Sequence, residues 1–257
     1  MDELQKEHFE GFMESGSGFT VYVTRSNFNR EVFEKILLNH NINPDMVPEN
    51  SDESENWNAQ WEANFEPILI GNRLLVKAPY HVLEGDYRYE LFLHSGTVFE
   101  MGEAESAELN FTLMLQMNFT GKTVLDFGSK DAVVGIFASM LGAEKVVVAA
   151  AEGQSMEHLH ENSSLNSVTN VELAHGGFNN LNEGVFDYIF VNTPKDIYLQ
   201  NLTKLFKMLV PGGQLIVGGV KDKDFVDVKF TTEKYNLVME DIETKKWWCV
   251  VYFNKPA

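Results

Sequence analysis

The chain has 257 residues, of which 44% are hydrophobic and 23% are charged. This balance is typical of a globular protein and excludes a disordered or fibrous chain. No stretch reaches the roughly 18 to 20 apolar residues of a membrane span, and the acidic start differs from a signal peptide. We therefore expect a cytoplasmic protein without a membrane partner.

Acidic side chains outnumber basic ones by 38 to 20, which gives a formal net charge of −18. Such a surface repels nucleic acid and attracts a basic protein, although solubility alone also explains it. The single cysteine, Cys249, can form neither an intrachain disulfide nor a multi-thiolate metal site. His158 and His160 lie two apart in a predicted helix and so do not share a face. We expect no metal and no nucleic-acid partner.

Residues 1–48 are expected to form a small α+β domain. It has a short helical start that includes Phe12, a strand over 19–23 and an amphipathic helix over 29–39.

Residues 49–66 read as an acidic linker followed by a Trp-rich helix. Trp57, Trp61 and Phe65 share one face of that helix, which indicates burial. Residues 67–257 are expected to form the larger domain, which opens with a hairpin around Gly71-Asn72.

A further strand over 87–92 and a helix over 105–117 lead into a regular alternation. Strands are expected at 123–127, 145–149, 170–173, 188–191, 214–217, 235–240 and 247–253, and helices at 133–141, 154–165, 197–209 and 222–231. This order predicts an α/β fold whose mostly parallel sheet is covered by helices on both faces. Ligands bind such sheets at the carboxyl ends of the strands.

The loop after the first strand of this alternation carries Asp126 and Gly128, which suit a backbone turn close to a bound nucleoside. Lys130 and Ala132 stand where a glycine-rich loop needs glycines, and a positive φ is costly there. A ribose-binding acid is expected at the end of the next strand, but Ala150 occupies that position. Glu152 follows two residues later.

Several fragments in order resemble the ribosomal protein L11 methyltransferase family. They are WNAQWEANFEPILIGNRLLV, GKTVLDFG, FDYIFVN, LVPGGQLIVGG and KKWWCVVYF. The resemblance implies a doubly wound, Rossmann-like methyltransferase sheet with a small, here shortened, substrate-recognising N-terminal domain. It also implies S-adenosylmethionine (SAM) as cofactor and a basic ribosomal protein as partner.

The resemblance implies a site residue by residue. Asn192 matches the family's catalytic-site asparagine, and Gly102, Asp126 and Gly128 match cofactor-binding positions. Glu152 is a further cofactor-binding candidate, because the expected ribose acid is missing.

The departures at positions 107, 130, 132 and 150 favour a degenerate homologue that binds SAM weakly or not at all and acts as a protein-binding module. The alternative is an active SAM-dependent N-methyltransferase on an amino group of a basic protein. A dinucleotide oxidoreductase is a more distant reading, because it needs the same missing glycines and acid.

Overall fold

The computed structural model describes residues 11–15, 18–22, 28–40, 42, 66–94, 103–150, 156–174, 181 and 184–257. The contacts between residues divide the chain into two units, Met1–Asn56 and Trp57–Ala257. Gly102, Glu152 and the Trp57/Trp61/Phe65 stripe lie outside the described residues. Among the described residues, no helix is long and apolar enough to cross a membrane.

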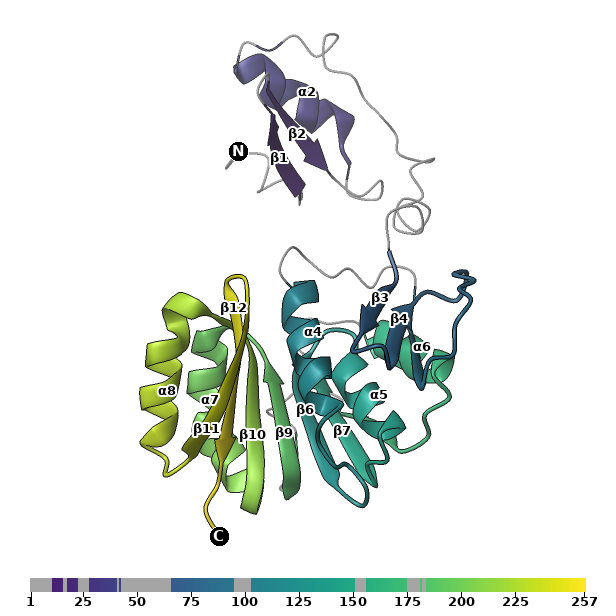
Figure 1. The fold of residues 1–257 in the computed structure, drawn as a ribbon. Coiled ribbons are helices and arrows are strands. Elements are labelled where there is room, and N and C mark those ends of the chain that lie inside the picture. The colour runs from purple at the N-terminus through teal and green to yellow at the C-terminus, as the bar shows by residue number, and fades with distance from the viewer. Residues whose placement is uncertain are drawn as a thin grey trace. The chain divides into compact units, whose positions relative to one another are not determined.

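The described residues of the first unit form one strand pair and one helix (Figure 1). Strands β1 (Gly11–Ser15) and β2 (Gly18–Tyr22) are antiparallel. Helix α2 (Arg30–Asn39) begins at Asn29, whose Oδ1 accepts the Val32 N–H at 3.3 Å. These elements confirm the expected strand and amphipathic helix. The expected helical start is wrong at Phe12, which lies in β1 because pairing with β2 outweighs local helical spacing.

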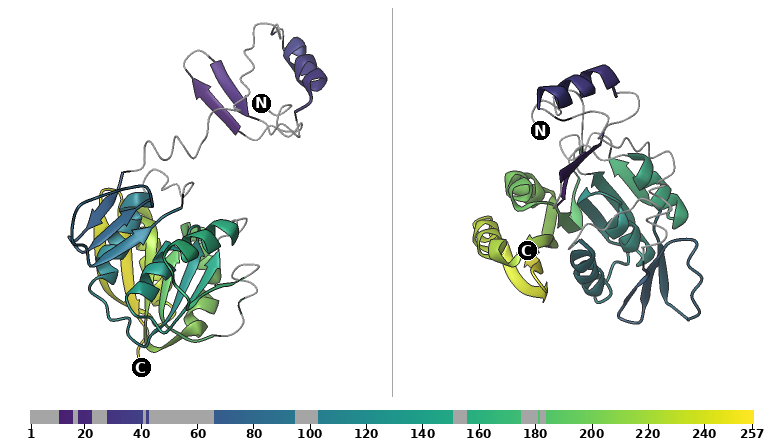
Figure 2. Two further views of the ribbon diagram at one scale, coloured as in Figure 1. Left: turned by 90° about the vertical axis from the view of Figure 1, so that its right-hand side faces the viewer. Right: turned by 90° about the horizontal axis from the view of Figure 1, so that it is seen from above.

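The first described elements of the second unit form a three-stranded sheet. Strands β3 (Ile68–Ile70) and β4 (Leu74–Lys77) form the expected hairpin, and β5 (Tyr89–Phe92) joins β4 in parallel. Residues 71–73 connect the paired Ile70 and Leu74, and Gly71 and Asn72 have φ values of 55° and 51°, which place both in the left-handed region. This sheet lies beside the helices α4 (Glu103–Met114) and α5 (Val133–Met140) (Figure 2).

Seven strands form the main sheet, in the order β11-β12-β10-β9-β6-β7-β8. Their bounds are β6 (Thr123–Ser129), β7 (Lys145–Ala150), β8 (Val171–Ala174), β9 (Phe186–Asn192), β10 (Leu209–Lys221), β11 (Val238–Lys245) and β12 (Trp248–Asn254). The five strands from β10 to β8 are parallel, and β12 is antiparallel to both of its neighbours. This arrangement confirms the expected mostly parallel sheet.

Helices cover both faces of this sheet (Figure 1). Helices α4, α5 and α6 (Met156–Leu165) pack on one face, and α7 (Lys195–Met208) and α8 (Phe225–Glu233) pack on the other. Alternate side chains of each strand pack against the helices on opposite faces of the sheet, because neighbouring side chains of a strand point to opposite faces. Thus Val124 packs in the α4–α6 layer and Leu125 in the α7–α8 layer.

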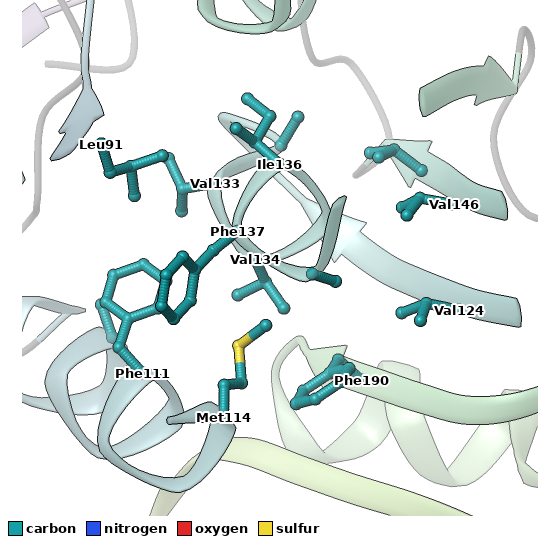
Figure 3. Close-up of a cluster of buried hydrophobic side chains, with 14 of the residues drawn as sticks. Leu91, Phe111, Met114, Val124, Val133, Val134, Ile136, Phe137, Val146 and Phe190 are labelled. Carbon is teal, nitrogen blue, oxygen red and sulfur yellow. The ribbon is translucent and has the colours of Figure 1, made fainter. Parts of the chain in front are cut away.

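The core of the α4–α6 layer joins the small sheet to the large one (Figure 3). Phe111 of α4 meets Phe137 of α5 edge to face, with ring centroids 5.4 Å apart. Leu91 of β5 and Phe190 of β9 belong to the same buried cluster. This packing fixes α4 and α5 over the ends of the parallel strands, where a ligand is expected.

Strand β11 begins three residues later than the strand expected at 235–240. Residues 235–237 precede β11, because α8 runs to Glu233 and the chain then turns through Asn236, whose φ is 60°. A 3₁₀ turn, Asp222–Asp224, precedes α8. This turn brings residues 221–224 to the same end of the sheet as the β6 and β9 loops.

Candidate active site

A cavity of about 570 Å³ opens at the carboxyl ends of β6, β9 and β10, beneath α4. Its volume lies within the range of roughly 300–1,000 Å³ that is usual for small-molecule sites. The lining residues come from α4, the β6–α5 loop, the β9–α7 segment and the β10–α8 segment. They are Ser106, Ala107, Asn110, Asp126, Ser129, Lys130, Asp131, Val133, Val134, Asn192, Thr193, Pro194, Lys195, Asp196, Gly219, Lys221, Lys223, Asp224 and Trp248.

Asp126 lies at the floor of this cavity and is 1% exposed. Its Oδ2 accepts the N–H of Gly135, in the first turn of α5, at 3.0 Å. Burial raises the pKa of the Asp126 carboxyl to about 6, against the lowering effect of the Gly135 N–H. Its other oxygen, Oδ1, is buried and has no hydrogen-bond partner among the described residues.

Gly128 makes the turn that the sequence predicts, with a φ of 79°. A Cβ at this position would lie 1.9 Å from Cγ2 of Thr193. The methyl group of Thr193 therefore fills the space above Gly128, and only glycine permits this packing. Thr193 is 8% exposed, and its Oγ1 has no partner among the described residues.

The rest of the β6–α5 loop is held by side chains. Ala132 has a φ of 59° and is fully buried, so the expected positive φ is present on a residue with a side chain. Its N–H donates to Oγ of Ser129 at 2.8 Å. The carbonyl oxygen of Asp131 accepts the side-chain N–H of Asn162, from α6, at 3.0 Å. Asn162 lies 31 positions after Asp131, and no local pattern indicated this contact.

Asn192 ends β9 and is exposed to the cavity. It pairs with Gly218 of β10 in the parallel register. Its Oδ1 lies so close to Gly219 that a Cβ there would be 2.7 Å away. The structure thus brings Asn192 and Asp126 to one cavity, and Gly128 lies beside it, packed against Thr193. Their chemical roles stay predictions.

Helix α4 brings two buried polar residues to the cavity, and sequence reasoning missed both. Ser106 and Asn110 are each 2% exposed. Oγ of Ser106 accepts the Gly219 N–H at 2.9 Å, and the side-chain N–H of Asn110 donates to the Ser106 carbonyl at 3.1 Å. Their spacing of four places both on one face of α4, which is the signal that could have found them.

An ion-pair network closes the opposite rim of the cavity. Nζ of Lys195, at the start of α7, lies 2.9 Å from Oδ1 of Asp224 and 3.1 Å from Oδ2 of Asp227. The hydrogen bond that Lys195 donates to Asp224 contributes most to raising the pKa of Lys195 above its ordinary range. This network ties the Thr193–Pro194 segment to α8.

Two alanines stand where the resemblance implies cofactor contacts. Ala107 lines the cavity, and Ala150 is buried at the end of β7 and does not line it. Neither side chain can form a hydrogen bond. Among the described residues, no cluster of three or more His, Cys, Asp or Glu side chains is arranged to hold a metal ion.

The sequence model of the family described as Ribosomal protein L11 methyltransferase (PrmA) matches residues 6–256. A ribosomal protein L11 methyltransferase of Bacteroides fragilis is 28% identical over 254 residues, which are 97% of this chain and 91% of the relative. One from Porphyromonas gingivalis is 27% identical over 256 residues, 98% of this chain and 88% of the relative.

Solved structures agree on the fold. The ribosomal protein L11 methylase of Lactobacillus delbrueckii subsp. bulgaricus has a TM-score of 0.68 at 18% identity, over 75% of this chain and 99% of that one. A Thermus thermophilus 16S rRNA methyltransferase in complex with AdoMet and guanosine has a TM-score of 0.51 at 18% identity, over 63% of this chain and 44% of that one. With a family model that matches nearly every residue, this chain belongs to the ribosomal protein L11 methyltransferase family.

Proposed function

We propose that this chain is an active SAM-dependent methyltransferase that modifies an amino group of a basic ribosomal protein. The observation that carries the proposal is the cavity that joins Asn192 to Asp126 at the carboxyl ends of the parallel strands. The nearly full-length match to L11 methyltransferases supports the same activity. It favours this reading over the degenerate homologue, which the sequence departures had put first.

The residues of the cavity fit a ligand of SAM's chemistry in part. Oδ1 of Asp126 and Oγ1 of Thr193 are buried acceptors without partners among the described residues, and both residues line the cavity. A buried unpaired oxygen is costly, so a ligand N–H or O–H that reaches it is favoured. The ammonium group and ribose hydroxyls of SAM are donors of this kind.

Ala107 and Ala150 lead us to expect that this site binds the cofactor with reduced affinity. A charge-assisted hydrogen bond contributes about 1.5–3 kcal/mol, so the carboxylate missing at Ala150 lowers affinity about ten- to hundredfold. The proposed role of Asn192, which orients the target amine, does not depend on the ribose contact that is missing at Ala150. We therefore expect weakened cofactor affinity together with retained chemistry.

When SAM is bound, it supplies a methyl group on a positively charged sulfur. Asn192 presents an amide to the cavity, and its oxygen can accept an N–H of the target amine and so orient the nitrogen lone pair. The net charge of −18 attracts a basic substrate by long-range electrostatics. A ribosomal protein substrate also suits the cytoplasmic location expected from the sequence.

The test is transfer of an isotope-labelled methyl group from SAM to purified bacterial ribosomal protein L11, followed by mass spectrometry. We expect transfer by the wild-type chain and a loss of about a hundredfold in kcat for Asn192→Ala. Asn201→Ala is the matched control, because Asn201 bonds only within α7, to the Ile197 carbonyl at 2.8 Å, outside the cavity. Wild-type protein that binds S-adenosylhomocysteine but methylates neither L11 nor other ribosomal proteins would contradict the proposal.

A further inference from the structure

We infer that Ser106 is a positioning residue for Asn192, and that it acts through a two-glycine bulge in β10, Gly218–Gly219. The inference rests on the proposed function, because Asn192 matters for chemistry only if it orients the target amine. The geometry that carries it stands without any bound ligand.

The bulge is visible in the strand register. From Val217 to Val220, β10 advances three residues, while its partner β12 advances two, from Val251 to Cys249. One extra residue on β10 is the definition of a β-bulge, and such bulges redirect side chains beside active sites. On the other side, the register with β9 ends where Gly218 meets Asn192. The bulge therefore begins beside the proposed catalytic residue.

A side chain on either bulge residue would displace an amide side chain that now packs against this backbone. A Cβ on Gly219 would lie 2.7 Å from Oδ1 of Asn192, and the φ of Gly219 is 69°. A Cβ on Gly218 would lie 2.6 Å from Nδ2 of Asn110. Two amide side chains, one from β9 and one from α4, thus rest directly on this backbone.

Ser106 holds the bulge in this shape. Gly219 has no register partner on β9 or β12, and its N–H donates instead to Oγ of Ser106 at 2.9 Å. Because Ser106 is 2% exposed, bulk water cannot readily replace this acceptor. Without the hydroxyl, the Gly219 N–H is left unpaired. The backbone of the bulge can then shift, and the side chain of Asn192 that packs against it can shift as well.

Helix α4 is itself anchored, so that Ser106 can act as a fixed point. Glu105 pairs with Lys246, and Glu108 pairs with Lys245, at the turn between β11 and β12. The side chain of Asn110 donates to the Ser106 carbonyl. A displacement of about 1 Å at a reacting group can lower a rate about a hundredfold. A serine fixed in this way therefore controls kcat without touching the substrate.

The test combines a spectroscopic readout with kinetics. The carboxamide ¹⁵N–¹H signals of Asn192, assigned by their loss in Asn192→Asp, report its position with no substrate present. In Ser106→Ala we expect these signals to shift and kcat for methylation of L11 to fall about tenfold or more. The KM for L11 and the Kd for S-adenosylhomocysteine should change less than about threefold, and Ser106→Thr, which keeps the hydroxyl, should restore both readouts.

Ser163→Ala is the matched control, because its hydroxyl bonds only the Leu159 carbonyl within α6, at 2.8 Å. If Ser106→Ala does not fold, Ser106→Cys keeps the volume and supplies only a weak sulfur acceptor, so the same shift is expected. Unmoved Asn192 signals would overturn the inference, as would a loss confined to S-adenosylhomocysteine affinity. If the wild type methylates nothing, the proposed function fails, and the Asn192 signals still decide the positioning role.

Discussion

Around the cavity, three positions that call for glycine hold glycine and one holds alanine, and the contacts distinguish the two cases. At Gly128, Gly218 and Gly219 an added Cβ would approach another side chain to less than 3 Å. At Ala132 the φ of 59° also favours glycine, yet the side chain is accommodated in the core. Glycine is thus indispensable where two elements pack against the backbone, and replaceable where only the backbone conformation calls for it.

The largest effect is expected at Gly128. Gly128→Ala combines a left-handed backbone with a Cβ 1.9 Å from Cγ2 of Thr193, so we expect about 3–4 kcal/mol of lost stability. Gly212→Ala is the control, because its φ is 75° and nothing lies within 4 Å of the added Cβ. It should cost only about 1–2 kcal/mol in urea unfolding. Equal losses in the two variants would remove packing from the explanation.

A smaller effect is expected for substitution of Asp126. At neutral pH it should raise the free energy of unfolding, whereas Gly128→Ala lowers it. Its folded-state pKa of about 6 lies above its ordinary value of 3.8, so folding favours the protonated form. The associated stability is complete below about pH 4 and is lost as pH rises through 6, a change of about 3 kcal/mol. Asp126→Asn abolishes this titration, so it should gain stability relative to the wild type between pH 4 and pH 7.

Asp187 supplies the control for that pH dependence. Burial acts to raise its pKa, but the Thr123 N–H and the Lys122 ammonium outweigh burial and lower it. The stability that this carboxylate contributes is therefore present at neutral pH and lost on acidification. Asp187→Asn should lose stability relative to the wild type at pH 7. Parallel pH curves for the two variants would contradict both assignments.

Asn162 tests whether the loop depends on side-chain support. Asn162→Ala removes the bond to the Asp131 carbonyl and the one from the His94 N–H, at 2.7 Å, and should cost about 2–3 kcal/mol. Asn166→Ala should cost about the same, because Asn166 makes two hydrogen bonds to the backbone of Phe92. Only Asn162 contacts the cavity loop. Its variant alone should weaken binding of S-adenosylhomocysteine, measured by calorimetry, by about tenfold.

The smallest effect is expected at Ala132. Ala132→Gly relieves about 1–2 kcal/mol of strain in the left-handed backbone. It also removes a buried methyl group and increases the conformational entropy of the unfolded chain, and both of these lower stability. The free energy of unfolding should therefore change by less than about 1 kcal/mol. Ala138→Gly, in the interior of α5 and also fully buried, lacks the strain and should cost about 2 kcal/mol. Matching losses in urea unfolding would show that the φ of Ala132 stores no strain.

The order of the elements and the loop with Asp126 and Gly128 could be predicted from the sequence, because periodicity and turn chemistry are local. The sequence showed that positions 130 and 132 lack the glycines of a glycine-rich loop, but only the structure shows that Ala132 has a positive φ and Lys130 does not. Asn192 was found through resemblance, since a lone asparagine after a strand carries no pattern of its own.

The remaining parts of the site depend on contacts between distant segments. Ser106 meets Gly219 across 113 positions, and Asn162 meets Asp131 across 31. Such pairs form only when the sheet order places their elements together, which one sequence does not reveal. The strand at Phe12 was missed for a related reason, because β1 is stabilised by its pairing with β2.

Binding of the methyl donor in this cavity, despite Ala150, distinguishes an active methyltransferase from a degenerate homologue. Thermal unfolding with S-adenosylhomocysteine, up to several millimolar and with NAD as control, tests this most directly. At ten times its Kd the ligand adds about 1.4 kcal/mol, so we expect the Tm to rise about 3–5 °C, and NAD to have no effect. An unchanged Tm at every concentration of S-adenosylhomocysteine would contradict the account and return the degenerate homologue to first place.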